Sequence, residues 1–366
     1  VDKENNPLPW VTYPFIYFIK FRLSNVNSIF EFGSGNSTLF YSNYVATLDA
    51  VEHDKGWYEH IKSNMPTMRN LIDNFIARQD KEGFLRGVDW EWNFIDWVDE
   101  WHTGPNPGTP PGIEYSVNAT YNWLFVYILG LAEKLEGYAG DVLMAERWHK
   151  TADNLSEKLK ERFWLPEKGL FKEDDSGENF SSHAQILAIL SGKLEANYTG
   201  KINEKLLHEK LPACSIFYRH YLFETLAEIE LSEKIFTELE LWNSFIDRGF
   251  KTAPETPVNR TFNQRSDCHG WGAHPIYHLI ANIAGIKPGS MGFGNVLIHP
   301  RMGKLQQLQA QCVHPKGMIS LTLEKITDCL NVKISLPAGV IGKFIFGENT
   351  ITLDNIKNNF AIKVNK

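Results

Sequence analysis

The sequence is poor in cysteine, has no long apolar run and carries only a modest excess of negative charge. Its four cysteines lie far apart and form no CxxC pair: Cys214, Cys268, Cys312 and Cys329. This spacing argues against a zinc cluster and against a dense disulfide framework, so we expect buried free thiols.

The other absences narrow the possible functions. No run of about 18 apolar residues is present, so no membrane-spanning helix is predicted. A formal charge of −7 argues against non-specific binding to nucleic acid or to anionic membranes. No charged segment followed by an apolar core opens the chain, so no signal peptide is predicted. The compartment and the oligomeric state are left open.

Aromatic residues, in contrast, are abundant at 13% of the chain. Five of the 11 tryptophans fall within 34 residues: Trp90, Trp92, Trp97, Trp101 and Trp123. Flat ring faces stack on the C–H faces of sugars, so this clustering suits a carbohydrate cleft. A large aromatic core would give the same composition.

Hydrophobic periodicity divides the chain into three regions, residues 1–65, 66–286 and 287–366. The first alternates short apolar strands with helices, which predicts a β-α-β-α unit with parallel strands. The second has eight amphipathic helical stripes with no strand between them, which predicts an array of α-hairpins or an α/α toroid. The third has an apolar period of two, broken by Gly, Pro, Asn and Asp turns, which predicts a β-sandwich.

One loop carries most of the candidate chemistry. Residues 255–278 read ETPVNRTFNQRSDCHGWGAHPIYH and run directly into an apolar helix. This density of acid, base, imidazole and indole groups beside buried structure predicts a pocket for a polar, ring-shaped ligand. Glu255 is the carboxylate available there for proton transfer, although a surface glutamate beside prolines fits the sequence equally well.

Two histidines near the end of this loop have a spacing that can hold a metal ion. His274 and His278 lie four residues apart, on one face of a helix. The segment between them lacks the glutamate of HExxH, and only His269 is near enough in sequence to complete a site. We therefore predict core or supporting histidines and no metal site.

The helical and β regions resemble the C-terminal part of the α-L-rhamnosidases, glycoside hydrolase family 78, from about residue 67 to residue 366. The shared motifs are residues 79–84 (QDKEGF), 92–97 (WNFIDW), 169–171 (GLF), 182–185 (SHAQ), 265–275 (RSDCHGWGAHP), 285–288 (GIKP) and 292–300 (GFGNVLIHP). Each motif is weak alone, but their order and spacing are specific.

The resemblance implies a six-hairpin toroid, a rhamnose-containing glycan or glycoside as substrate, and inverting hydrolysis without a cofactor. Inverting glycosidases hold a general acid and a water-activating carboxylate about 6.5–9.5 Å apart. Glu255 matches the family's general base, and His269 and Trp271 would shape the sugar subsite. Asp96 and Trp97 match a pair that hydrogen-bonds to rhamnose and stacks on it. A helix N-cap beside a packed indole is the structural alternative for that pair.

The chain departs from the family upstream of residues 92–97. The acidic, Arg-Glu-containing segment that carries the family's general acid is absent. Six hairpins contain twelve helices, and the sequence predicts eight. We therefore expect an incomplete toroid that lacks about two hairpins, with impaired hydrolysis.

Residues 1–65 resemble instead the beginning of a class I S-adenosylmethionine-dependent methyltransferase, a Rossmann-like fold. The motifs are residues 7–14 (PLPWVTYP), 30–38 (FEFGSGNST) and 51–54 (VEHD). The resemblance implies that Gly33 and Gly35 form the turn at the cofactor, with Glu31 just before the turn, and that Glu52 binds the ribose hydroxyls of the cofactor. It ends near residue 65, after two of seven strands, so cofactor binding is the weaker expectation.

The chain thus reads as two partial enzymes joined near residue 65. Three functions remain open: an impaired rhamnosidase-type hydrolase, a non-catalytic rhamnose-binding remnant, and a methyltransferase fragment. The natural glycan and its linkage are not predicted.

Overall fold

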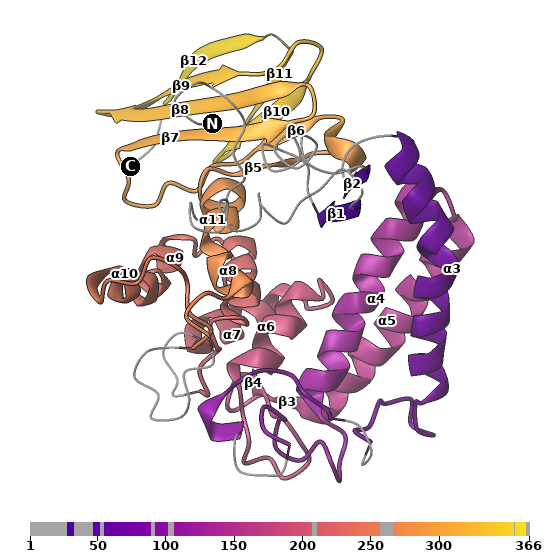
Figure 1. Ribbon diagram of the computed structural model, residues 1–366. Coiled ribbons are helices and arrows are strands. Elements are labelled where there is room, and N and C mark those ends of the chain that lie inside the picture. The colour runs from indigo at the N-terminus through magenta and orange to yellow at the C-terminus, as the bar shows by residue number, and fades with distance from the viewer. Residues whose placement is uncertain are drawn as a thin grey trace.

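The computed structural model consists of a helical region and a strand-rich domain at one end of it (Figure 1). It describes residues 28–32, 47–51, 55–88, 92–101, 106–206, 211–256, 266–354 and 356–363. None of the described helices combines the length and the apolar character that a membrane span requires.

Two short strands precede the helices. β1 (Ser28–Phe32) and β2 (Thr47–Val51) pair in parallel, which confirms the pairing predicted from the sequence. Glu31 lies in β1. The other three residues predicted to bind the cofactor lie outside the described part of the chain: Gly33, Gly35 and Glu52. The S-adenosylmethionine site therefore stays a prediction.

The first described helix differs from the prediction. The sequence suggests one helix ending near Met65 and a second one after Pro66, but a single helix, α3 (Lys55–Ala77), passes through Pro66. Proline inside a helix removes one backbone hydrogen bond, so packing must hold the two halves together. Met65 and Ile72, on either side of Pro66, are both buried. The predicted domain boundary at residues 65 and 66 thus falls inside α3.

The described part of the helical region contains nine α-helices. After α3 these are α4 (Ala119–Ala139), α5 (Val142–Phe163), α6 (Ser182–Leu190), α7 (Ala196–Leu206), α8 (Arg219–Glu228), α9 (Glu233–Glu238), α10 (Glu240–Asp247) and α11 (Pro275–His278). A single π-helical turn, Leu279–Ile283, continues α11.

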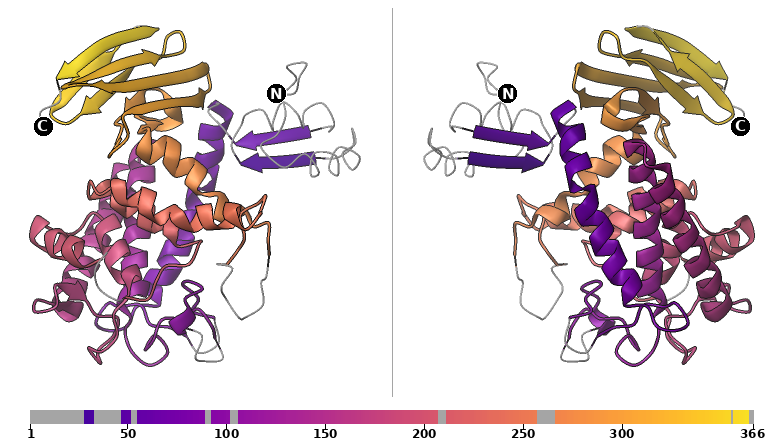
Figure 2. Two further views of the ribbon diagram at one scale, coloured as in Figure 1. Left: turned by 90° about the vertical axis from the view of Figure 1, so that its left-hand side faces the viewer. Right: turned by 90° about the vertical axis from the view of Figure 1, so that its right-hand side faces the viewer.

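Helices α3, α4 and α5 lie side by side (Figure 2). Gly140 ends α4 in the left-handed conformation at φ 83°, and the side chain of Asp141 then caps the start of α5. Arg69 of α3 bonds Glu136, which is fully buried, and Asp141, with an N–O distance of 2.8 Å to each. One guanidinium therefore ties α3 to the α4–α5 hairpin.

The C-terminal domain contains two four-stranded sheets. One has the order β11-β10-β6-β5 and the other β12-β9-β8-β7. Their strands are β5 (Ile286–Pro288), β6 (Val296–Ile298), β7 (Gln307–His314), β8 (Gly317–Ile326), β9 (Cys329–Ser335), β10 (Gly342–Phe346), β11 (Asn349–Leu353) and β12 (Lys357–Lys363). The rings of Phe344 on β10 and Phe360 on β12 meet between the sheets, 5.4 Å apart. A strand-rich region built of sheets is therefore confirmed.

The cysteines agree with the prediction only in part. All four are free, but only Cys214 is buried, while Cys268 and Cys329 are exposed.

Candidate active site

Backbone hydrogen bonds pair the segment of residues 253–255 with the segment of residues 266–269. The amide of Glu255 donates to the carbonyl of Ser266 at 2.9 Å, and the amide of His269 donates to the carbonyl of Ala253 at 2.8 Å. The loop between them, residues 257–265, lies outside the described residues. The side chain of Glu255 is only 7% exposed, and its Oε2 lies 3.7 Å from Nδ1 of His269. A surface position for Glu255 is thus wrong.

A glycine makes this close approach possible. Gly272 lies in the 3-10 turn Gly270–Ala273, and the indole N–H of Trp242 donates to its carbonyl at 2.7 Å. A Cβ atom on Gly272 would lie 2.9 Å from both the side chain of Ala253 and the carbonyl of Pro254. Only glycine lets the turn rest on the segment that leads into Glu255.

His269 and Trp271 are packed together beside the carboxylate. Their ring centroids lie 4.1 Å apart, and Trp271 also contacts Phe217 at 5.3 Å. A mainly apolar pocket of about 690 Å³ opens next to the turn, with His269 and Gly272 in its wall. We call Glu255, His269 and Trp271 the Glu255 cluster. It combines a carboxylate, an imidazole and an indole, which suits a polar ligand with an apolar face.

Asp96 has a different environment. It is fully buried, and its carboxylate is surrounded by protein groups. Oδ1 accepts from the amide of Trp97 at 2.9 Å and from the hydroxyl of Ser215. Oδ2 accepts from the amide of Ser215 at 2.9 Å and faces Nε2 of His183 at 2.8 Å. A carboxylate offers about four acceptor positions, and protein groups take all of them, so Asp96 ties the loop of Trp97 to α6 and to the segment before α8.

Trp97 belongs to an aromatic cluster at the surface. Its ring lies 5.0 Å from that of Phe94 and 5.6 Å from that of Trp92. Trp92 is 52% exposed, and its indole N–H donates to the carbonyl of Pro107 at 2.9 Å. These three rings, the Trp92 cluster, are inclined to one another by 57–63°. The exposed face of a single indole, such as that of Trp92, is the kind of surface that stacks on sugars.

A row of rings joins Asp96 to the Glu255 cluster. His183, the partner of Asp96, lies 4.2 Å from Tyr218, and Tyr218 lies 6.2 Å from Phe217, which contacts Trp271. Burial raises the pKa of Tyr218 well above its usual value, so its hydroxyl keeps its proton. Sequence reasoning missed His183, Ser215, Phe217 and Tyr218. Only His183 carried a signal, through the motif at residues 182–185.

The histidine pair at the end of the loop has a partner that the sequence did not suggest. His269 packs with Trp271, whereas His220 of α8 joins His274 and His278, with one ring nitrogen of each within 4.8 Å of the others. Burial lowers the pKa of His278 to about 2 and that of His274 to about 4, so both are neutral at neutral pH.

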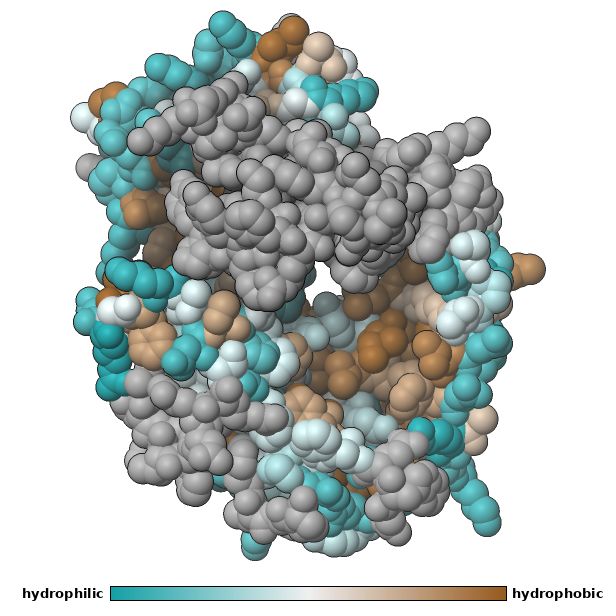
Figure 3. All heavy atoms as spheres, in the orientation of Figure 1, coloured by the Kyte–Doolittle hydropathy of each residue, from teal (hydrophilic) through white to brown (hydrophobic). Residues whose placement is uncertain are grey.

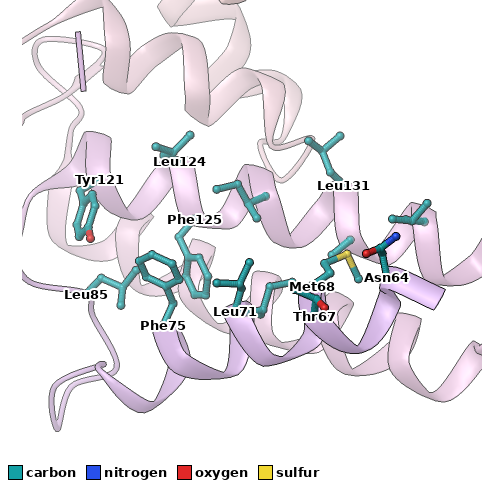
Figure 4. Close-up of a pocket in the computed structure, with 14 residues that line it drawn as sticks. Asn64, Thr67, Met68, Leu71, Phe75, Leu85, Tyr121, Leu124, Phe125 and Leu131 are labelled. Atoms are coloured by element: carbon teal, nitrogen blue, oxygen red, sulfur yellow. The ribbon is translucent and has the colours of Figure 1, made fainter. Parts of the chain in front are cut away.

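A second pocket, of about 590 Å³, lies between α3 and α4 (Figure 4). Figure 3 shows a hollow near the middle of the molecule, and hydrophobic residues line its right-hand wall, on the side where Figure 1 places α3 and α4. Its walls are formed by side chains such as Leu71, Phe75, Leu124 and Leu131, and they contain no carboxylate, imidazole or amine. The phenol of Tyr121 is the one titratable group among the described residues that line this pocket, so the Glu255 cluster is the better candidate for acid–base chemistry.

A family model, the bacterial alpha-L-rhamnosidase 6 hairpin glycosidase domain, matches residues 53–283. The match starts earlier than the predicted resemblance at residue 67 and includes the first half of α3. A search of curated proteins found no significant match.

Solved rhamnosidases have a similar fold. The GH78 rhamnosidase of Bacillus sp. GL1 gives a TM-score of 0.70 at 21% identity, over 81% of this chain and 32% of that enzyme. The α-L-rhamnosidase of Dictyoglumus thermophilum gives 0.67 at 16%, over 84% and 38%. That of Streptomyces avermitilis, complexed with L-rhamnose, gives 0.61 at 16%, over 86% and 32%.

This chain therefore spans roughly a third of the length of these enzymes, and identities this low show a shared fold alone. The family model, however, covers more than half of the chain. The chain belongs to the bacterial α-L-rhamnosidase six-hairpin glycosidase family.

Proposed function

We propose that this chain is an α-L-rhamnosidase-type hydrolase domain in which Glu255 is the catalytic base. The position of Glu255 carries the proposal. Its carboxylate is almost completely buried, lies 3.7 Å from an imidazole and belongs to a loop beside a pocket. A carboxylate held in this way can take a proton from a water molecule that it positions.

In an inverting reaction, Glu255 accepts a proton from water while the water oxygen attacks the anomeric carbon of rhamnose. The bond to the glycosidic oxygen breaks on the opposite face of the ring, and a second carboxyl group protonates that oxygen. The sequence lacks the acidic segment that supplies this proton in the family. Loss of a positioned acid costs about 10²–10⁴-fold in rate, so we propose slow hydrolysis.

The remaining predicted residues form the sugar subsite in this proposal. Trp271 and His269 contact the ring next to Glu255, and Trp97 offers a stacking face. Asp96 acts through Trp97, because its own oxygens are occupied by Ser215, His183 and the amide of Trp97. It is therefore a positioning residue.

The choice of leaving group tests this mechanism. A 4-nitrophenyl rhamnoside releases a stable phenolate and needs little help from an acid, whereas a methyl rhamnoside needs full protonation. We expect measurable hydrolysis of the aryl substrate, at least about 100-fold faster than that of the methyl rhamnoside. Proton NMR should show that the first rhamnose released has the inverted anomeric configuration. Equal rates on both substrates would show that an acid is present after all.

A rhamnose-binding remnant without catalysis is the second candidate, favoured by the exposed Trp92 and the half-buried Trp97 of the Trp92 cluster. Calorimetry with L-rhamnose should then show binding that Trp97→Ala removes. Tyr138→Ala is the control, because Tyr138 is an exposed aromatic residue on α4, outside the Trp92 cluster. This substitution should leave binding unchanged. Absence of both binding and aryl-rhamnoside hydrolysis would refute both candidates.

An S-adenosylmethionine-binding fragment is the third candidate, and the parallel pairing of β1 with β2 favours it. Equilibrium binding of the cofactor tests it. Binding that Glu52→Ala leaves unchanged would refute the predicted ribose contact.

A further inference from the structure

Three histidines from two helices meet outside the Glu255 cluster. His220 comes from α8, and His274 and His278 lie one turn apart at α11. Nδ1 of His220 and Nε2 of His278 are 3.1 Å apart. Two nitrogens on one tetrahedral zinc ion lie about 3.3 Å apart, given Zn–N lengths of about 2.0–2.1 Å. This pair is therefore already at the spacing that a shared ion requires.

One ring nitrogen of His274 has no hydrogen-bond partner in the cluster. Its Nε2 faces the carbonyl of Ile216 at 2.9 Å and must donate to it, so the lone pair lies on Nδ1. That Nδ1 is buried and has no hydrogen-bond partner among the described residues. Buried polar atoms are nearly always satisfied, and an unsatisfied one points to a bound ion or water.

The outer nitrogens of the two α11 histidines face groups that suit metal ligands. A metal-bound imidazole usually gives its other N–H to a carbonyl or a carboxylate, which fixes its tautomer. The carbonyl of Ile216 plays this part for His274. Nδ1 of His278 lies 3.6 Å from the carboxylate of Glu224 and accepts at 2.7 Å from the NH2 group of Asn282, which also donates to Glu224 at 3.0 Å. The proton of the neutral His278 ring is therefore on Nε2, which faces His220.

The surroundings of the three imidazoles are apolar on one side and open on the other. Aromatic rings pack against the buried side of the cluster, with Phe223 5.0 Å from His278 and Trp242 5.1 Å from His274. Each neutral imidazole has one ring nitrogen with a free lone pair, which a metal ligand requires. His220 is only partly buried, and Tyr277 beside it is 49% exposed, so an ion can enter from that side.

We propose that His220, His274 and His278 bind one divalent transition-metal ion, with zinc as the reference ion and water as the fourth ligand. On binding, the proton of His278 moves from Nε2 to Nδ1, and the NH2 group of Asn282 turns away so that Nδ1 can donate to Glu224. The ion joins α8 to α11, so it stabilises the folded chain. The site is separate from the Glu255 cluster, and its test does not depend on rhamnoside hydrolysis.

Calorimetric titration with zinc tests the site, using the untagged full-length chain after treatment with a chelator. We expect one zinc ion per chain, a higher melting temperature with zinc, and the visible spectrum of tetrahedral cobalt when Co²⁺ replaces zinc. His220→Gln, at a partly exposed position that should still fold, is expected to weaken binding by more than about 100-fold. Glu224→Gln should weaken it by about 10–100-fold, as loss of such outer partners does.

His149→Gln is the matched control. His149 is 49% exposed on α5, away from the cluster, where it contacts Glu133. Zinc affinity should be the same in this variant as in the unmodified chain. Equal zinc binding by His220→Gln, His149→Gln and the unmodified chain would overturn the proposal. Absence of binding by the folded, unmodified chain would overturn it as well.

Discussion

Nδ1 of His269 lies 3.7 Å from Oε2 of Glu255, and the same imidazole ring packs on Trp271 at 4.1 Å. One histidine thus contacts both the proposed base and an indole of the proposed sugar subsite. The aromatic and polar side chains of this loop hold one another in place: Trp271 packs on His269, and His269 faces Glu255. Disturbing the backbone beneath this cluster should therefore affect activity more than stability.

Gly272→Ala tests that backbone contact. The added Cβ would lie 2.9 Å from Ala253 and from the carbonyl of Pro254, so the segment before Glu255 must move. We expect kcat on an aryl rhamnoside to fall by about 10²-fold, since displacements near 1 Å have such effects. Overpacking should lower the free energy of unfolding by about 1–3 kcal/mol.

Gly270→Ala is the matched control in the same turn, because a Cβ there meets nothing within 4 Å. It should keep its activity. If both variants retain full kcat, the contact between the turn and the Glu255 segment has no role in catalysis.

Asp96→Asn tests the structural role of the buried carboxylate. Asparagine replaces one acceptor oxygen with a donor, which then faces the donors of His183 or Ser215. Hydrogen bonds to charged groups contribute about 1.5–3 kcal/mol, so we expect a loss of about 2 kcal/mol, measured by urea denaturation. Asp153→Asn, an exposed position, should cost less than about 1 kcal/mol. Equal unfolding of Asp96→Asn and the unmodified chain would contradict this role.

Glu173 predicts a pH dependence of stability. It is fully buried, and burial raises its pKa although Ser181, Thr120 and Asn118 donate to it. The folded chain therefore holds this proton more tightly than the unfolded chain does. As pH rises from the ordinary value of 4.5 toward the raised one, the unfolded state ionises first and stability falls.

The matching measurement is the free energy of unfolding of Glu173→Gln and of the unmodified chain between pH 4 and pH 7. The unmodified chain should lose stability relative to the variant as pH rises, by at most about 1.4 kcal/mol per pH unit. Two parallel pH profiles would show that Glu173 keeps an ordinary pKa.

The sequence predicted the regions where periodicity is strong. The helical stripes, the switch to strands after residue 287 and the parallel pairing of β1 with β2 agree with the structure. The prediction of no strand between the helices is wrong at one place, because β3 (Trp164–Leu165) and β4 (Leu170–Phe171) form a short hairpin between α5 and α6. The predicted strands did not include β7 or β11. In β7, Gln alternates with Leu, Ala and Cys, and only Leu308 and His314 are buried. The sequence also predicted a helix end at Pro66, because proline usually breaks a helix. The buried side chains of Met65 and Ile72, which hold α3 together across Pro66, could not be predicted from the local sequence.

The site was harder to predict because its contacts are distant in sequence. The partner of Asp96 is His183, 87 residues away, and the partner of His278 is His220, 58 residues away. Residue spacing along one helix suggested His274 with His278, but no local pattern points to a third histidine on α8. The Glu255 cluster was predictable because its members lie within 17 residues of one another, in one loop.

The most direct test of the central claim is the rate of aryl rhamnoside hydrolysis by Glu255→Gln, with Glu167→Gln, an exposed substitution after α5, as the control. Glutamine keeps the size of the side chain but cannot accept the proton of water. Our account predicts that kcat falls by about 10²–10⁴-fold in Glu255→Gln alone, with an unchanged melting temperature. Hydrolysis by Glu255→Gln at the unmodified rate would contradict the assignment of Glu255 as the base.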